Sequence, residues 1–180
     1  MASLLSSLVN AQITASMVVG LHGEHLGTDG TSKSLGGQED FELLMFFRKR
    51  SNIVLTTGKT ARAENYRLPS TVSLAVLTRL GRNSLPPALQ VPEVLLLGSE
   101  GEISPATAIK QLSKGSLGPV HIEFGPSALL ETLAVLNEVR TFISSEHKTG
   151  GPRFAVNHQL RVVSGFRYGK LYVTEVSGRA

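Results

Sequence analysis

Short apolar runs alternate along the chain with segments of helical spacing. A short run of consecutive apolar residues is typical of a strand that is covered on both faces. The pattern therefore predicts six buried strands, at residues 15–21, 53–56, 72–77, 94–97, 120–124 and 139–143. Near the C-terminus, residues 160–176 predict a hairpin that turns around residues 168–170.

Three helices are predicted between these strands. The first covers residues 39–50, because acidic residues stand at its start and basic residues at its end, as the helix dipole favours. The second runs from 104 to 112, with Ser104 as N-cap and Pro105 in the first turn. The third covers residues 125–136.

Buried strands that alternate with helices predict a sheet covered on both faces. The terminal hairpin requires part of this sheet to be antiparallel. We therefore predict an α/β three-layer sandwich, with a mixed, mostly parallel central sheet, helices on both faces and a C-terminal antiparallel hairpin. The length suits one domain, so residues 1–180 are expected to form a single domain. The Pro-, Gly- and Ser-rich segment 81–92 is predicted to be a surface loop.

The composition excludes several kinds of site. The chain contains no Cys, which excludes disulfides, cysteine nucleophiles, iron–sulfur clusters and thiolate zinc sites. The first 21 residues lack the basic start of a secretory signal. No apolar run approaches the ~18 residues of a spanning helix. We therefore expect a cytoplasmic protein with no membrane partner.

The net charge of +4 suggests anionic partners. The basic excess lies in residues 33–82, which contain nine Lys and Arg against four Asp and Glu. A small anionic ligand, a nucleic acid or solubility alone could each account for it. Only 6% of residues are aromatic and none is Trp, which disfavours a base-stacking platform for single strands. The basic run Arg48–Arg50 is a solvated helix end or an anion contact.

Other candidate motifs are incomplete or absent. The segment Thr57–Thr60 resembles the end of a phosphate-binding P-loop, but Ile53 stands where that motif requires Gly. A glycine-containing turn after a strand can still bring backbone N–H groups close to a phosphate. His22 and His25 lack the spacing of a metal site, so we predict no metal. Neither a serine-hydrolase elbow nor a G-x-G-x-x-G dinucleotide motif is present.

The segment from Glu123 to Ser127 is the most informative local feature. A strand ends at an acidic residue, and Gly125 and Pro126 then start a helix. Glycine permits close backbone approach, and a helix N-terminus offers N–H groups and a positive dipole end to a phosphate. An ordinary strand-to-helix connection has the same pattern, but the carboxylate beside the turn favours a functional site.

Four segments, in this order, resemble one known family. They are Met17–Gly23, Gly30–Asp40, Arg48–Leu68 and Glu123–Ser127. The chain resembles the reductase domain of the riboflavin-biosynthesis deaminase/reductase, which has a dihydrofolate-reductase-like fold. In that family the first segment ends in Ser-Leu-Asp-Gly and the fourth reads Glu-x-Gly-Pro-Thr. The resemblance covers residues 15–176.

The resemblance implies an NADPH-dependent reductase and a homodimer. Its substrate would be a small molecule, a pyrimidine with a phosphoribosyl group such as 5-amino-6-(5-phosphoribosylamino)uracil, and no nucleic acid would be bound. The substrate side would comprise Ser32, Arg48, Leu68 and Glu123, with Arg48 contacting the phosphate. Arg79 and Arg82 would favour NADPH through its 2′-phosphate. The cofactor side would comprise Val18, Ser34, Gly58, Thr60, Glu64, Thr78, Arg79, Gly125, Pro126, Ser127, Ala128 and Leu129.

Departures from the family pattern leave the substrate open. His22 replaces an Asp, Ser34 replaces a Trp and Tyr66 replaces a Pro, and the Arg expected shortly after Leu68 is missing. No catalytic residue is assigned, because His22 and Glu123 are candidates for proton transfer by residue type only. The alternatives are a non-catalytic nucleotide-binding homologue, a dihydrofolate-reductase-like enzyme with another substrate, and a nucleic-acid-binding module built on residues 33–82.

Overall fold

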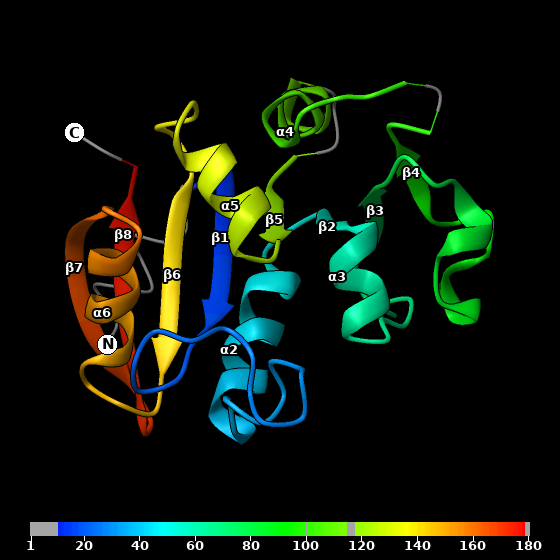
Figure 1. Cartoon of the computed structure of the whole chain (residues 1–180). Coiled ribbons are helices and arrows are strands. Elements are labelled where there is room, and N and C mark those ends of the chain that lie inside the picture. The colour runs from blue at the N-terminus through cyan, green and yellow to red at the C-terminus, as the bar shows by residue number, and fades with distance from the viewer. Residues whose placement is uncertain (1–10, 100, 115–117, 179–180) are drawn as a thin grey trace.

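Eight strands form one sheet in the order β4-β3-β2-β5-β1-β6-β8-β7 (Figure 1). The structure, a computed structural model, describes residues 11–99, 101–114 and 118–178. The strands are β1 (Ile13–Val18), β2 (Ile53–Thr57), β3 (Ser73–Leu77), β4 (Leu95–Leu97), β5 (Val120–Glu123), β6 (Arg140–Ser145), β7 (Arg161–Tyr168) and β8 (Leu171–Ser177).

The first six strands are parallel to one another. Strand β1 lies in the middle of the sheet, where Ala15 is opposite Ile122 on one side and Thr141 on the other. Strand β8 runs antiparallel to β6, and β7 pairs with β8 to complete the C-terminal hairpin. The prediction of a mostly parallel sheet with an antiparallel terminal hairpin is therefore confirmed.

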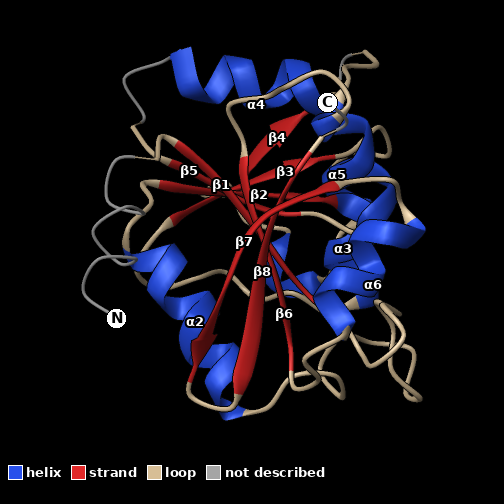
Figure 2. Ribbon diagram, turned by 90° about the vertical axis from the view of Figure 1, so that its left-hand side faces the viewer, coloured by secondary structure: helices blue, strands red, loops and turns tan. Residues whose placement is uncertain are grey.

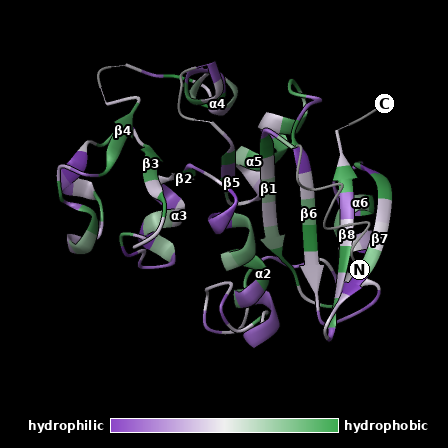
Figure 3. Cartoon of the chain, turned by 180° about the vertical axis from the view of Figure 1, so that it is seen from behind, coloured by the Kyte–Doolittle hydropathy of each residue, from purple (hydrophilic) through white to green (hydrophobic). Residues whose placement is uncertain are grey.

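Helices cover both faces of the sheet (Figure 2). Helix α2 packs against one face, where Leu43 and Phe47 belong to the same core cluster as Phe142 of β6 and Val173 of β8. Helices α5 and α6 lie against the opposite face (Figure 2). Hydrophobic positions concentrate along the strands between these layers (Figure 3). The helices are α2 (Gln38–Lys49), α3 (Gly58–Ala63), α4 (Pro105–Lys114), α5 (Pro126–Leu133) and α6 (Gly150–Asn157).

Several predicted boundaries shift. Strand β1 covers residues 13–18 and not 15–21, because the chain turns at Gly20, whose N–H donates to the carbonyl of Glu24 at 2.8 Å. Helix α5 ends at Leu133, and β6 continues to Ser145. The predicted cap of α4 is present, since Ser104 Oγ accepts from the N–H of Thr107 at 3.1 Å.

Segment 81–92 is not simply a surface loop. It contains two short 3-10 helices, Arg82–Ser84 and Pro87–Leu89. Leu85 and Leu89 are buried in a core cluster that includes Leu74 and Val76 of β3. The prediction was wrong on this point because the apolar side chains of the segment outweigh its turn-forming residues.

Helices α3 and α6 were missed. Helix α3 has only six residues. Helix α6 begins with Gly150 and Gly151, which have low helix propensity. Both glycines are needed for packing, because a Cβ would lie 2.5 Å from the Gly20 carbonyl oxygen or 2.4 Å from Thr174 Oγ1. Glycine is therefore required at both positions because α6 packs closely against the sheet. Its low helix propensity is the reason why the sequence did not predict this helix.

Candidate functional site

A cavity of about 1130 Å³ lies at the carboxyl ends of the central parallel strands. It is bounded by Val18 of β1, Thr57 of β2, Glu123 of β5 and Ser144 of β6. Ligands of open α/β sheets bind at this edge. Pockets for drug-sized ligands measure roughly 300–1,000 Å³, so this cavity has room for a large ligand or for two ligands side by side.

Two helices begin next to each other at the cavity. Thr57 caps α3, because its Oγ1 accepts from the N–H of Thr60 at 3.0 Å. The Oγ1 of Thr60 in turn accepts from the N–H of Gly125 at 3.1 Å, which joins the start of α3 to the start of α5. Helix N-termini carry partial positive charge and favour anions. This end of the cavity is therefore suited to phosphate groups.

Gly125 leaves open space at the start of α5. Its φ of −69° is available to any residue, so the backbone conformation does not require glycine. A Cβ at this position would meet only Thr60 Oγ1, at 3.5 Å. Within the described residues, no side chain caps α5. The missing side chain instead lets a ligand approach the backbone closely, which fits the phosphates of a dinucleotide such as NADPH.

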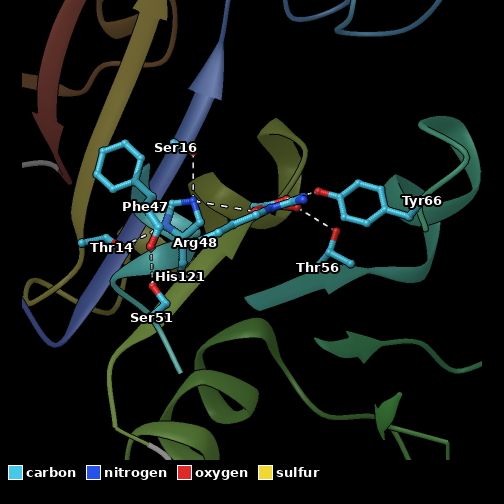
Figure 4. Close-up of polar contacts among 9 residues, drawn as sticks. Thr14, Ser16, Phe47, Arg48, Ser51, Thr56, Tyr66 and His121 are labelled. Carbon is cyan, nitrogen blue, oxygen red and sulfur yellow. Dashed lines mark hydrogen bonds and ion pairs between the residues drawn. The ribbon is translucent and has the colours of Figure 1, made fainter. Parts of the chain in front are cut away.

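A hydrogen-bonded cluster centred on Glu123 forms another part of the wall (Figure 4). The Arg48 Nε and Nη2 groups donate to the two carboxylate oxygens at 2.7 and 2.6 Å. The Tyr66 hydroxyl donates to the same carboxylate, and Thr56 Oγ1 donates to the Glu123 carbonyl at 2.8 Å. The cluster thereby links α2, β2, β5 and the segment after α3.

The two charges of this cluster stabilise each other. Burial by itself raises the pKa of Glu123, but the hydrogen bonds and charge of Arg48 outweigh it and hold the pKa below its usual range. Burial lowers the pKa of Arg48, and the Glu123 carboxylate more than reverses this. Burial and the neighbouring carboxylate raise the pKa of Tyr66. Glu123 is therefore ionised, Arg48 is charged and Tyr66 is neutral near pH 7.

His121 forms a second buried layer beside this cluster. Its Nδ1 is 2.9 Å from Thr14 Oγ1, and its Nε2 is 3.1 Å from Ser16 Oγ, which lines the cavity. The ring stacks on Phe47 with 5.0 Å between centroids (Figure 4). Burial lowers the pKa of His121 to about 4, so the imidazole is neutral near pH 7 and holds the Ser16 hydroxyl in place.

Asp40 is a cavity residue that the sequence analysis missed. It lies in the first turn of α2 and accepts a 2.6 Å hydrogen bond from Ser144 Oγ of β6. Burial raises the pKa of this carboxyl group above its ordinary value of 3.8. Asp40 ends the second segment of the resemblance and also suits a helix start, but no site role was assigned to it, and the predicted strand stopped before Ser144.

The cavity brings together most of the predicted site residues. These are Val18, Thr60, Glu64, Gly125, Pro126, Ser127 and Ala128 from the cofactor set and Ser32, Arg48, Leu68 and Glu123 from the substrate set. The N–H of Ser32 donates to Glu64 Oε1 at 2.9 Å, so the loop after β1 contacts the end of α3 here.

Five predicted residues do not line the cavity: Ser34, Gly58, Thr78, Arg79 and Leu129. Ser34 donates to Asp29 at 2.8 Å on an exposed turn. Gly58 and Thr78 are in contact, since a Cβ on Gly58 would lie 2.7 Å from Thr78 Oγ1. Leu129 is buried in the main core.

The two arginines expected at the 2′-phosphate have protein partners. Arg79 forms an exposed ion pair with Glu102 at 2.9 Å. The Arg82 guanidinium donates to the carbonyls of Val91 and Val94, the latter at 3.1 Å, and so holds the loop before β4.

His22 lies on the α6 side of its loop and does not line the cavity. Its Nδ1 is 2.5 Å from Arg153 Nη1, and its carbonyl accepts from Asn157 at 3.1 Å. His25 does line the cavity, and burial lowers its pKa.

In the part of the chain that the structure describes, no group of His, Asp and Glu residues could hold a metal ion, and no helix is long and apolar enough to cross a membrane.

Comparison with known proteins finds similarity in structure only. No protein-family model and no curated protein sequence matches the chain. The crystal structure of a pyrimidine reductase-like protein from Corynebacterium diphtheriae matches with a TM-score of 0.62 and 16% identity, over 96% of this chain and 94% of that one. A dihydrofolate reductase from Enterococcus faecalis, complexed with NADP(H), matches with a TM-score of 0.54 and 14% identity, over 94% and 96% of the two chains.

A third match is a two-activity protein from Thermotoga maritima. It is a diaminohydroxyphosphoribosylaminopyrimidine deaminase/5-amino-6-(5-phosphoribosylamino)uracil reductase, with a TM-score of 0.57 and 15% identity. The match covers 92% of this chain but only 56% of that protein. At these identities the similarity concerns the fold. The chain has the dihydrofolate-reductase-like fold that these solved structures share.

Proposed function

We propose that this protein is an NADPH-dependent reductase of a pyrimidine or related heterocycle. The observation that carries the proposal is the cavity itself. Two helix N-termini and Gly125 lie at one end of it, and the partly buried carboxyl group of Asp40 lines it as well. The same fold in a pyrimidine reductase-like protein and in a dihydrofolate reductase complexed with NADP(H) supports this proposal.

The start of α5 would hold the phosphates of the cofactor. The backbone of Ser127 and Ala128 follows Pro126 in the first turn, where helical N–H groups have no partner within the helix. Lys59, exposed in the first turn of α3, adds a positive charge at the same end. When NADPH is bound, its nicotinamide supplies the hydride, and the protein supplies orientation and electrostatics.

Asp40 is the group best placed to hold a proton for the substrate. Its raised pKa favours the protonated carboxyl group, and the Ser144 hydroxyl fixes its orientation at 2.6 Å. The Asp40→Asn variant should keep NADPH affinity and lose turnover by about 100-fold or more, the usual contribution of a general acid.

Binding of NADPH tests the first step. Thermal unfolding is measured with NADPH, with NADH and without nucleotide. A ligand specific for the native state at 100 times its Kd stabilises that state by about 2.7 kcal/mol. We expect a clear rise in Tm with NADPH, and the rise with NADH measures the contribution of the 2′-phosphate. No rise at saturating NADPH contradicts the proposal.

Turnover tests the second step. NADPH oxidation is followed with a panel of pyrimidines and pterins, including 5-amino-6-(5-phosphoribosylamino)uracil, the substrate that the sequence resemblance implies. Size-exclusion chromatography with light scattering tests the homodimer that the same resemblance implies.

One observation favours a second candidate, a nucleotide-binding protein without turnover. Arg48 and Glu123, two of the charged groups in the cavity wall, neutralise each other. NADPH binding without oxidation by any member of the panel would identify this candidate.

A further inference from the structure

The charges of Arg48 and Glu123 cancel within the cavity wall. Their side chains are only 15% and 5% exposed, and two N–H groups of the guanidinium meet the two carboxylate oxygens. Tyr66 donates a further hydrogen bond to the carboxylate. These three residues, here called the floor cluster, form a unit with no net charge.

A phosphate could bind Arg48 only by displacing Glu123. The displaced carboxylate would remain buried without its cation, and breaking a buried ion pair in this way is strongly unfavourable. The neighbouring His121 is neutral near pH 7 and offers no compensating charge, because burial lowers its pKa to about 4. The floor cluster is therefore a poor site for an anion.

The floor cluster is suited to an uncharged polar ring. A guanidinium carries five N–H donors, of which Glu123 accepts two, so Arg48 retains donors for a carbonyl oxygen. Carboxylate oxygens of Glu123 have lone pairs for a ring N–H. Leu44, Leu68 and Pro69 add apolar surface to the same cavity. A heterocycle edge with alternating carbonyl and N–H groups is complementary to the Arg48 donors and the Glu123 acceptors.

Anions have better partners among the exposed cations of the cavity. Lys33 and Arg67 line the cavity and are exposed. Neither of these two shares an ion pair with an acidic side chain in the part of the chain that the structure describes. These residues, here called the rim cations, can contact a phosphate without breaking an internal pair.

Resting on the proposed function, we propose that the floor cluster binds the uncharged edge of the substrate heterocycle, and that Arg48 does not bind a substrate phosphate. Any phosphate of the substrate lies at the rim cations. This assignment reverses the role that the sequence resemblance implies for Arg48 and makes the Arg48–Glu123 pair a determinant of substrate specificity.

The test compares two ligands that differ by one phosphate. Dissociation constants of uridine and uridine 5′-monophosphate are measured by calorimetry on the NADP⁺-saturated protein. The double variant Arg48→Gln/Glu123→Gln removes both charges together and leaves no unpaired buried ion. We expect the affinity ratio of the two ligands to be the same in the double variant and in the wild type, within about twofold.

A single variant, unlike the double variant, should change the affinity ratio of the two ligands. Glu123→Gln leaves Arg48 charged without its partner, so a phosphate can bind Arg48 in place of the ring edge. The monophosphate should then gain about tenfold over uridine, which is the contribution of one charge-assisted contact. Tyr66→Phe keeps the ion pair and should leave the ratio unchanged. Chemical unfolding confirms that each variant is folded.

Two results overturn the inference. One is a tenfold or larger loss of monophosphate preference in the double variant, which would show that Arg48 binds phosphate. The other is a wild-type protein that binds NADP⁺ but neither pyrimidine. Failure to bind NADP⁺ is a separate outcome, because it contradicts the proposed function, and the two pyrimidines can still be compared on the protein without nucleotide.

Discussion

The Ser144 hydroxyl donates a 2.6 Å hydrogen bond to the Asp40 carboxylate, which joins the carboxyl end of β6 to the first turn of α2. These residues are 104 positions apart in the sequence. The contact places a partly buried acid beside a cavity that also has two helix N-termini. We therefore expect Asp40 to influence both stability and turnover.

Asp40→Asn should raise stability at neutral pH. The pKa of Asp40 is raised in the folded state by burial, so the folded state holds a proton that the unfolded state has released. Stability is consequently lost as pH rises from the ordinary value of 3.8 through the folded pKa. Asparagine keeps an oxygen for Ser144 and carries no charge. Tm measured against pH should show the variant above the wild type at pH 7 and level with it near pH 3.

His121 should produce the opposite pH dependence. Its pKa falls from 6.5 in the unfolded chain to about 4 in the folded protein, so the unfolded state binds the proton more readily. Stability should decrease as pH falls from 6.5 to 4, by up to about 3 kcal/mol. Urea unfolding between pH 7 and 4.5 measures this slope.

Two variants identify His121 as the source of that slope. His121→Gln should remove most of it, and His147→Gln, at an exposed position, should keep it. An equal slope in both variants would assign the acid sensitivity to other groups.

Gly125→Val should block the cofactor without unfolding the protein. The Cβ would meet only Thr60 Oγ1 at 3.5 Å, and the φ of −69° suits valine. The added methyl groups project where a phosphate would approach, so NADPH affinity should fall by at least about tenfold. Gly101→Val is the matched control, because a Cβ there has no neighbour within 4 Å and the residue does not line the cavity. Wild-type NADPH affinity in Gly125→Val would show that the phosphates lie elsewhere.

The two arginine ion pairs should differ sharply in their contribution to stability. Arg48→Ala leaves the nearly buried Glu123 carboxylate without its cation and should cost about 3–5 kcal/mol. Arg79→Ala removes a pair whose side chains are 72% and 75% exposed and should cost less than about 1 kcal/mol. Urea unfolding at pH 7 compares the two variants. Similar costs would mean that the Arg48 pair is solvated in solution.

Much of the fold could be predicted because its central strands contain short runs of apolar residues. Residues 53–57 and 120–123 lie inside the sheet and are mostly buried, so their apolar positions indicate strands even though Thr, His and Glu stand among them. Helix α6 could not be predicted in the same way. Gly150 and Gly151 are required by contacts with Gly20 and Thr174, which are distant in the sequence.

The candidate site could be predicted only in part. The resemblance placed Arg48 and Glu123 together on the substrate side, and both line the cavity. It did not predict that they bind each other, because a pairing between α2 and β5 has no local sequence pattern. Tyr66 was noted only as a departure from the family, yet its hydroxyl completes the carboxylate's hydrogen bonds.

The central position of β1 has a consequence for the order of folding. Strand β1 pairs with β5 and β6, whose residues lie at 120–123 and 140–145. During synthesis, more than half of the chain must therefore be made before the apolar segment Ile13–Val18 can pair with β5 or β6. Long-range parallel pairing of this kind slows folding and leaves strand edges open to aggregation. A nascent chain that stalls before residue 120 therefore exposes β1 without either of its neighbouring strands.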